Sequence, residues 1–426
     1  MNTRLGFHYF EDQDHYQAKD LDLWLQELIS LNANWLVLKA STTQAIPEEF
    51  ITKLVDSGIQ PVIHFDFPVN SEVRPEELRV LLTAYAKWGV KYVIFFNRPN
   101  TKAAWIGETW SQGDIISRFL NRYLSFTRLA EQFELTPIFP PLAPGGEYWD
   151  ISFLKSLLNL VKQRHVRDFD DQFVQAVSAQ SFGHTLTYGH GGPGKWKMTL
   201  PYSKPELGEE DHIGFNTWSW YSSLVQQILG IRPKMVLFWM GTSNVSKEEL
   251  DSRLSFETLT KIMEDEPSES LPALSEDVLA CMCAQLGAKS DEAMGKTAWF
   301  DTQGRPNDPT IATYQKQLQK TQKQSLETPL ATKLADWLYA IDHFLLLPSF
   351  EWGIPENLFD QIRPFVRTHR PTMGFSITEA SNARKVTVWN EDGAFSEDDI
   401  QFLRESGCIV EELILHTLRM TVEQDF

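Results

Sequence analysis

Short apolar runs alternate with longer stretches of helical periodicity over residues 1–304, and this alternation constrains the fold more than any other feature. It predicts strands at Leu5–Phe10, Trp35–Lys39, Pro61–Phe65, Lys91–Phe96, Thr136–Phe139, Phe173–Ala179, Met235–Trp239 and Thr297–Phe300. Helices are predicted between them at 20–31, 47–58, 75–88, 114–132, 151–163, 216–229, 247–264 and 275–286. Near-continuous apolar strands are typical of a parallel sheet covered on both faces. Eight β/α units in a row favour a closed (β/α)₈ barrel over an open doubly wound sheet.

The chain after residue 304 changes in character. Residues 305–334 are polar and are predicted to form a linker or solvated helix. Residues 335–426 resume the alternation on a smaller scale and are predicted to form a small α/β domain. Within it, Ser396 and Asp399 have the spacing of a capping box at the start of a helix.

Composition and missing motifs exclude several classes of protein. The net charge of −18 argues against a nucleic-acid or anionic-membrane partner, because binding phosphate requires a basic surface. The three cysteines cannot form a disulfide framework in 426 residues. Cys281 and Cys283 lie in the predicted apolar helix 275–286 and are expected to be buried in the protein core. No G-x-G-x-x-G follows the first predicted strand, and the sequence has no P-loop, HExxH or G-x-S-x-G motif, so no cofactor is expected. With no apolar leader segment and no run long enough to span a bilayer, we expect a cytoplasmic protein.

Ligands of (β/α)₈ barrels bind on the loops that follow the carboxyl ends of the strands. In this sequence those positions are rich in aromatic, amide and carboxylate groups, and the chain has 14 Trp. Aromatic faces with a few polar groups suit a sugar, whose C–H face is apolar and whose hydroxyls need hydrogen-bond partners. The predicted ligand-binding residues are His8, His64, Asn97, Arg98, Asn100, Trp105, Trp149, His190, Trp196 and Trp239.

His64-x-Asp66 resembles a two-ligand fragment of metal-binding barrels. No second strand offers a matching pair, so structural or hydrogen-bonding histidines are predicted and no metal is expected.

The fourth predicted strand ends in Phe-Phe-Asn-Arg-Pro-Asn at residues 95–100. This resembles the strand-four signature of clan A glycoside hydrolases, in which a hydrophobic run ends in Asn-Glu-Pro and the Glu is the general acid/base. The resemblance implies a second Glu, the nucleophile, at the end of strand seven. Asn97 and Pro99 match the signature, but Arg98 occupies the acid/base position, and Trp239 or Met240 stands where the nucleophile is expected.

These substitutions leave three functional hypotheses open. In the first, the barrel binds carbohydrate without the standard two-Glu retaining mechanism, because Arg cannot donate a proton near neutral pH. An Arg there would hold a carboxylate or phosphate, which fits an acidic sugar. In the second, a glycoside hydrolase or lyase uses relocated carboxylates, with Asp66, Glu147 and Asp150 as candidates. In the third, the barrel is structural or binds a partner.

Overall fold

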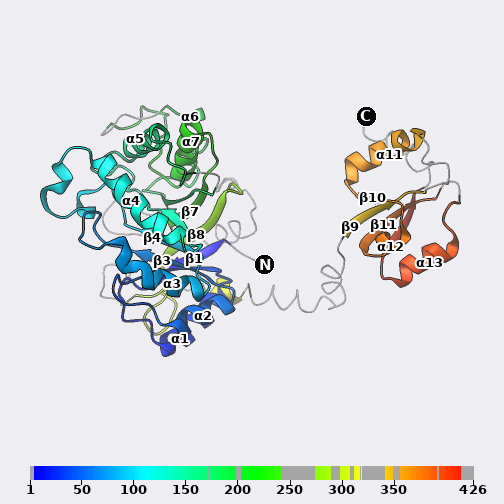
Figure 1. The fold of residues 1–426 in the computed structure, drawn as a ribbon, viewed down its shortest axis with the longest axis horizontal. Coiled ribbons are helices and arrows are strands. Elements are labelled where there is room, and N and C mark those ends of the chain that lie inside the picture. The colour runs from blue at the N-terminus through cyan, green and yellow to red at the C-terminus, as the bar shows by residue number, and fades with distance from the viewer. Residues whose placement is uncertain are drawn as a thin grey trace. The chain divides into compact units, whose positions relative to one another are not determined.

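The computed structural model describes residues 4–169, 172–197, 203–241, 274–288, 298–307, 311–316, 318, 341–348, 356–390 and 393–413. The chain divides into two compact units, Met1–Gln319 and Lys320–Phe426 (Figure 1). The division falls within the polar segment 305–334, and the predicted helix at 247–264 lies outside the described residues. Within the described part, no helix is both long and apolar enough to cross a bilayer.

The first unit is a closed barrel of eight parallel strands in the order β1 to β8, with β8 paired to β1. The strands are β1 (Leu5–His8), β2 (Trp35–Lys39), β3 (Gln60–Phe65), β4 (Tyr92–Phe95), β5 (Thr136–Phe139), β6 (Val174–Gln180), β7 (Lys234–Gly241) and β8 (Val278–Gln285). The longer helices are α1 (Ala18–Ser30), α2 (Glu48–Asp56), α3 (Arg79–Lys87), α4 (Ile115–Glu131), α5 (Asp150–Gln163) and α7 (Thr217–Leu229). One-turn helices are η1 (Pro75–Leu78), η2 (Lys102–Ala104), η3 (Gly107–Ser111) and α6 (Gly192–Lys195). The predicted (β/α)₈ fold is therefore confirmed.

Side chains of the strands pack in two separate layers. One set fills the inside of the barrel and includes Val37, Ile94, Ile138, Val236 and Phe238. The alternate set packs outward beneath the helices, which Figure 1 shows around the outside of the strands. Gly6 faces inward, where a Cβ atom would lie 2.6 Å from Trp35 Cβ and 2.8 Å from the Trp35 carbonyl oxygen.

The eighth strand is not the one predicted from the sequence. Val278–Gln285, which was expected to be helical, is β8, and the described part of Thr297–Phe300 forms only isolated bridges at Phe300. Ala280 and Met282 face the barrel interior, whereas Cys281 and Cys283 pack in the outer layer. A strand buried on both faces is apolar throughout, so its sequence does not distinguish it from a buried helix. The burial expected for the two cysteines is confirmed.

The second unit is a small α/β domain, as predicted. Its four parallel strands lie in the order β10 (Thr372–Gly374), β9 (Ile341–Leu346), β11 (Ala383–Trp389) and β12 (Ile409–Leu413). Helix α11 (Glu356–His369) covers one face of the sheet, and α12 (Ile377–Ala380) and α13 (Glu397–Glu405) cover the other (Figure 1). The capping box at the start of α13 is confirmed, because Ser396 Oγ accepts the Asp399 N–H and Asp399 Oδ2 accepts the Ser396 N–H.

Candidate functional site at the barrel mouth

The barrel interior ends, at the carboxyl side of the strands, in a group of polar side chains. Lys39 and His64 continue the inward-facing series of β2 and β3, because they follow the interior residues Val37 and Val62 at a spacing of two. His8 stands at the same end of β1, two residues after the inward-facing Gly6. We call this group the barrel mouth, and we include in it the neighbouring residues Asp66, Asn97, Arg98 and Trp239.

Aromatic rings form the floor and one wall of the mouth. Phe238, in the interior layer, meets the edges of both His8 and His64, with ring centroids 4.6 and 5.3 Å away. The partly exposed Trp239 stacks on His8 at a centroid distance of 3.7 Å and an interplanar angle of 4°. The predicted ligand-binding residues His8, His64 and Trp239 are therefore gathered at one place.

Both histidines form hydrogen bonds with backbone carbonyls, and these bonds determine which ring nitrogen carries the proton. His8 Nε2 bonds the Phe238 carbonyl oxygen, and His64 Nε2 bonds the Phe96 carbonyl oxygen at 3.0 Å. A carbonyl only accepts hydrogen bonds, so each Nε2 carries a proton. The Nδ1 atoms have no hydrogen-bond partner among the described residues, so in the neutral rings they are acceptors.

Both histidines are neutral near pH 7. Burial lowers the pKa of His8 to about 3 against the opposing hydrogen bond to the Phe238 carbonyl, and the positive charge of Arg98 lowers it further. Burial likewise lowers the pKa of His64, although the nearby Asp66 carboxylate opposes the shift. Protonating either ring would place a charge in a buried site next to existing cations.

Charged and amide groups lie beside the histidines. Lys39 Nζ is 3.9 Å from Asp66 Oδ2, and Asn97 Nδ2 is 3.4 Å from the same oxygen. Arg98 is exposed and lies within electrostatic reach of Asp66, His8 and Glu11. Asn97 Oδ1 and Trp239 Nε1 are buried without a hydrogen-bond partner in the described part of the chain, which is rare for buried polar atoms.

The turn that carries Asn97 and Arg98 has strained backbone. Phe96 and Arg98 have φ of 70° and 44°, values that non-glycine residues seldom adopt. The hydrogen bonds that hold the turn include His64 to the Phe96 carbonyl at 3.0 Å and the Arg98 N–H to the Pro141 carbonyl at 3.0 Å.

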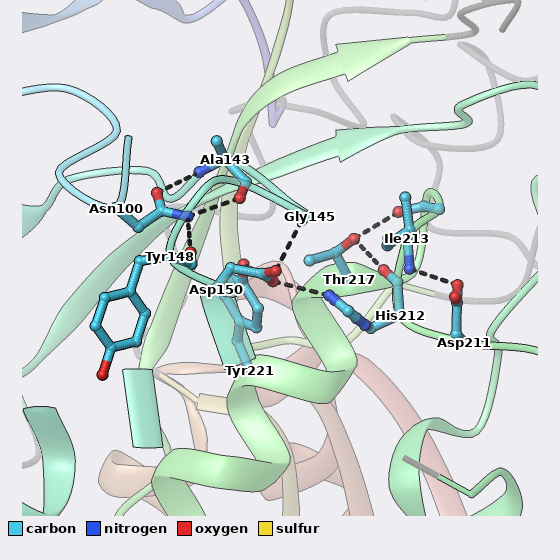
Figure 2. Close-up of polar contacts among 11 residues, drawn as sticks. Asn100, Ala143, Gly145, Tyr148, Asp150, Asp211, His212, Ile213, Thr217 and Tyr221 are labelled. Atoms are coloured by element: carbon cyan, nitrogen blue, oxygen red, sulfur yellow. Dashed lines mark hydrogen bonds and ion pairs between the residues drawn. The ribbon is translucent and has the colours of Figure 1, made fainter. Parts of the chain in front are cut away.

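Asn100, a predicted ligand-binding residue, ties two loops together (Figure 2). Its side chain is fully buried, and Nδ2 donates to the carbonyls of Ala143 at 2.8 Å and Tyr148 at 3.0 Å. Its Oδ1 accepts the Ala143 N–H at 2.8 Å. Both amide donors are occupied by backbone, so the observed role of Asn100 is to fix the loop after β5 against the loop after β4.

Asp150, one of the three catalytic candidates, lies in a closed polar cluster at the start of α5 (Figure 2). It is completely buried, its Oδ1 accepts the Gly145 N–H at 2.8 Å, and its Oδ2 accepts the Tyr221 hydroxyl at 2.6 Å. His212 Nε2, also buried, lies 2.9 Å from Oδ2. Burial alone would raise the pKa of Asp150, but the field of His212 and these hydrogen bonds leave it lowered. The surroundings of this carboxylate are those of a structural residue.

Three of the other predicted residues contact residues of the loops that follow the strands. Glu147 is exposed and accepts the Lys102 N–H at 3.2 Å. Trp105 is buried and donates to the Pro99 carbonyl at 2.9 Å. Trp149 is buried with its ring 5.3 Å from His212.

His190 and Trp196 belong to the long loop between β6 and α7. His190 is exposed, and its carbonyl accepts the Trp196 indole N–H at 2.9 Å. Lys195 Nζ lies 4.4 Å from the Trp196 ring centroid. A ligand-binding role for this pair stays a prediction.

Sequence reasoning missed Lys39, His212 and Tyr221. Lys39 could have been found, because it is a charged residue ending an apolar strand on the inward-facing side. His212 and Tyr221 gave no signal, since they meet Asp150 from positions 62 and 71 residues further along the chain. The described residues contain no cluster of three or more His, Cys, Asp or Glu that could hold a metal ion.

No protein-family profile and no curated protein matches the chain. Among solved structures it is similar to a monomeric β-xylosidase from Caulobacter crescentus, with 12% identity and a TM-score of 0.45 over 74% of this chain and 67% of that one. It is similar to an endo-β-1,3-glucanase from Amycolatopsis mediterranei solved with laminaripentaose, with 12% identity and a TM-score of 0.38 over 74% and 98%. A third is Saccharomyces cerevisiae Gas2p with laminaritetraose and laminaripentaose, with 7% identity and a TM-score of 0.43 over 73% and 62%.

The fold defines the chain as a (β/α)₈ barrel followed by a small α/β domain. The similar structures are clan A glycoside hydrolases, the family that the strand-four motif resembles. Identities of 7–12% and TM-scores below 0.5 carry no argument about what this chain binds or catalyses.

Proposed function

We propose that the barrel mouth binds an acidic carbohydrate and does not cleave it by the two-Glu retaining mechanism. The observation that carries this proposal is the combination of an aromatic wall, Trp239 on His8, with two cations, Lys39 and Arg98. An indole face suits the C–H side of a sugar ring, and a guanidinium suits a carboxylate. The neutral histidines supply Nδ1 acceptors for sugar hydroxyls without adding positive charge.

The proposed absence of the standard mechanism is supported by the residues at the two positions that the strand-four resemblance assigns to glutamates, Arg98 and Trp239. Arg98 stays protonated near neutral pH and cannot act as a general acid, and Trp239 cannot form a glycosyl ester. Proton transfer alone contributes roughly 10²- to 10⁴-fold to such reactions. We therefore expect no retaining turnover of neutral aryl glycosides.

Hydrolysis by a relocated carboxylate is a second candidate, favoured by the position of Asp66 beside Lys39 and Asn97. Such an enzyme needs a second carboxyl across the scissile bond. Asp150 is buried in its own cluster and Glu147 contacts Lys102, so Asp66 is the strongest of the three original candidates.

The binding test is calorimetry with glucuronic acid, glucose and their oligosaccharides. We expect Arg98→Ala to weaken binding of the acidic ligands by about 10- to 100-fold, the value of a charge-assisted hydrogen bond. Arg232→Ala is the matched control, because Arg232 is exposed just before β7, at the opposite end of the barrel. Equal affinities of the two variants would contradict the proposal.

The activity test is a time course with nitrophenyl glycosides. Turnover by the wild type that disappears in Asp66→Asn would establish the relocated-carboxylate enzyme. No turnover together with no binding of any sugar would favour the structural or partner-binding role.

A further inference from the structure

A polar cleft of about 310 Å³ lies on the same face of the barrel as the mouth. Its walls come from the loops after β1 and β2, and the residues lining it include Gln13, Asp14, Tyr16, Ser41 and Gln44. In a barrel of parallel strands, loops that follow the strands all emerge at the carboxyl end. The cleft is therefore at the same end of the barrel as the site described above, although none of the mouth residues lines it.

Lys39 connects the cleft to the mouth. Its carbonyl oxygen accepts the Tyr16 hydroxyl at 2.8 Å on the cleft side, and its Nζ is 3.9 Å from Asp66 in the mouth. Tyr16 is buried and packs on Tyr9 and Phe50, with ring centroids 5.6 and 5.3 Å away. The wall between the two sites is thus a fixed part of the fold.

The residues lining the cleft include no Lys or Arg, whereas the mouth has Lys39 and Arg98 beside Asp66. Gln13 and Gln44 are exposed, and their amides make no hydrogen bond to any described residue. Each amide offers two donors and an acceptor, which match sugar hydroxyls. The one charged side chain among the lining residues, Asp14, is acidic and would repel an anionic group.

We infer that the chain binds an acidic oligosaccharide, with the acidic unit in the mouth and a neutral unit in the cleft between the β1 and β2 loops. This inference rests on the proposed function. A volume near 310 Å³ is at the lower end of small-ligand sites, which suits one sugar unit better than several.

The test compares glucuronic acid with disaccharides that join glucuronic acid to glucose in either order, by calorimetry on the full chain. We expect at least one disaccharide to bind more tightly than the monosaccharide. The double variant Gln13→Ala/Gln44→Ala should weaken that disaccharide by about 10-fold, as expected for losing two neutral hydrogen bonds, and leave glucuronic acid unchanged. Gln227→Ala, an exposed glutamine on α7, is the matched control and should change neither affinity.

The outcomes separate the two proposals. If Arg98→Ala weakens both ligands but the double glutamine variant binds the disaccharide like the wild type, the cleft is not a subsite and the mouth proposal stands. A disaccharide that binds no more tightly than glucuronic acid also overturns the subsite. If neither ligand binds the wild type, the mouth proposal fails and the subsite fails with it.

Discussion

The buried carboxylate of Asp150 is expected to make a large contribution to the free energy of unfolding, and this contribution can be measured. The variant Asp150→Asn keeps the volume of the side chain and an acceptor for the Gly145 N–H, but it cannot be ionised beside His212. A hydrogen bond to a buried charged group contributes about 1.5–3 kcal/mol to stability, and a buried partner left unpaired adds to the cost of losing it. Since Asp150 accepts more than one such bond and the amide retains part of them, we expect a loss of ~3 kcal/mol.

The loss can be measured by urea denaturation followed by tryptophan fluorescence. With a dependence on urea of about 3 kcal/mol per molar, the transition midpoint should fall by roughly 1 M. Asp22→Asn is the control, because Asp22 forms an exposed ion pair with Lys53 and should shift the midpoint little. An Asp150→Asn midpoint equal to that of Asp22→Asn would refute the reasoning.

The dependence on pH gives a second readout. The pKa of Asp150 is lower in the folded chain than its ordinary value of 3.8, so its carboxylate stabilises the fold above that value. This contribution is lost as the pH falls below about 4 and through the folded pKa. The free energy of unfolding should therefore fall less steeply in acid for Asp150→Asn than for the wild type.

Three further predictions concern the frame around the site. Asn100→Ala removes three hydrogen bonds to buried loop backbone and should cost ~3 kcal/mol, measured by the same denaturation. Gly6→Ala places a Cβ 2.8 Å from the Trp35 carbonyl oxygen and should destabilise the barrel by about 1–3 kcal/mol. Gly58→Ala is the comparison: its new Cβ has no atom within 4 Å, so any loss of stability there comes from backbone strain alone. Ser396→Ala removes the cap of α13 and should lower the stability of the second unit by ~1 kcal/mol, with Ser396→Thr as the conservative control.

Local pattern was enough to predict most of the fold. The bounds of Trp35–Lys39 and Thr136–Phe139 agree with β2 and β5, because polar or turn residues flank both apolar runs. β8 was missed because both of its faces are buried, so Val278–Gln285 lacks the period-two alternation of polar residues that marks a half-buried strand. The predicted count of eight strands is correct, but the sequence pattern places the eighth at Thr297–Phe300 and the structure has it at Val278–Gln285.

The candidate site was less predictable, because burial depends on contacts between distant loops. Asp66 directly follows β3, and Asp150 ends the loop that follows β5, so the sequence places both carboxylates at the same end of the barrel. Asp150 is enclosed because His212 and Tyr221 contact its carboxylate. No local sequence pattern predicts those contacts. Asp66 has no such cover, and its side chain remains 32% exposed beside Lys39.

The backbone around Asn97 adds a reason to place function at the mouth. Positive φ at two non-glycine residues, Phe96 and Arg98, costs of the order of 1–3 kcal/mol each and persists only where surrounding contacts hold it. Those contacts include the Nε2–H of His64 on the Phe96 carbonyl, while the Nε2–H of His8 holds the carbonyl that precedes Trp239. The two neutral histidines thus fix the backbone next to Asn97 and Trp239. A turn kept at this cost, with Arg98 at its exposed side, favours a preorganised binding site over a loop that only closes the barrel.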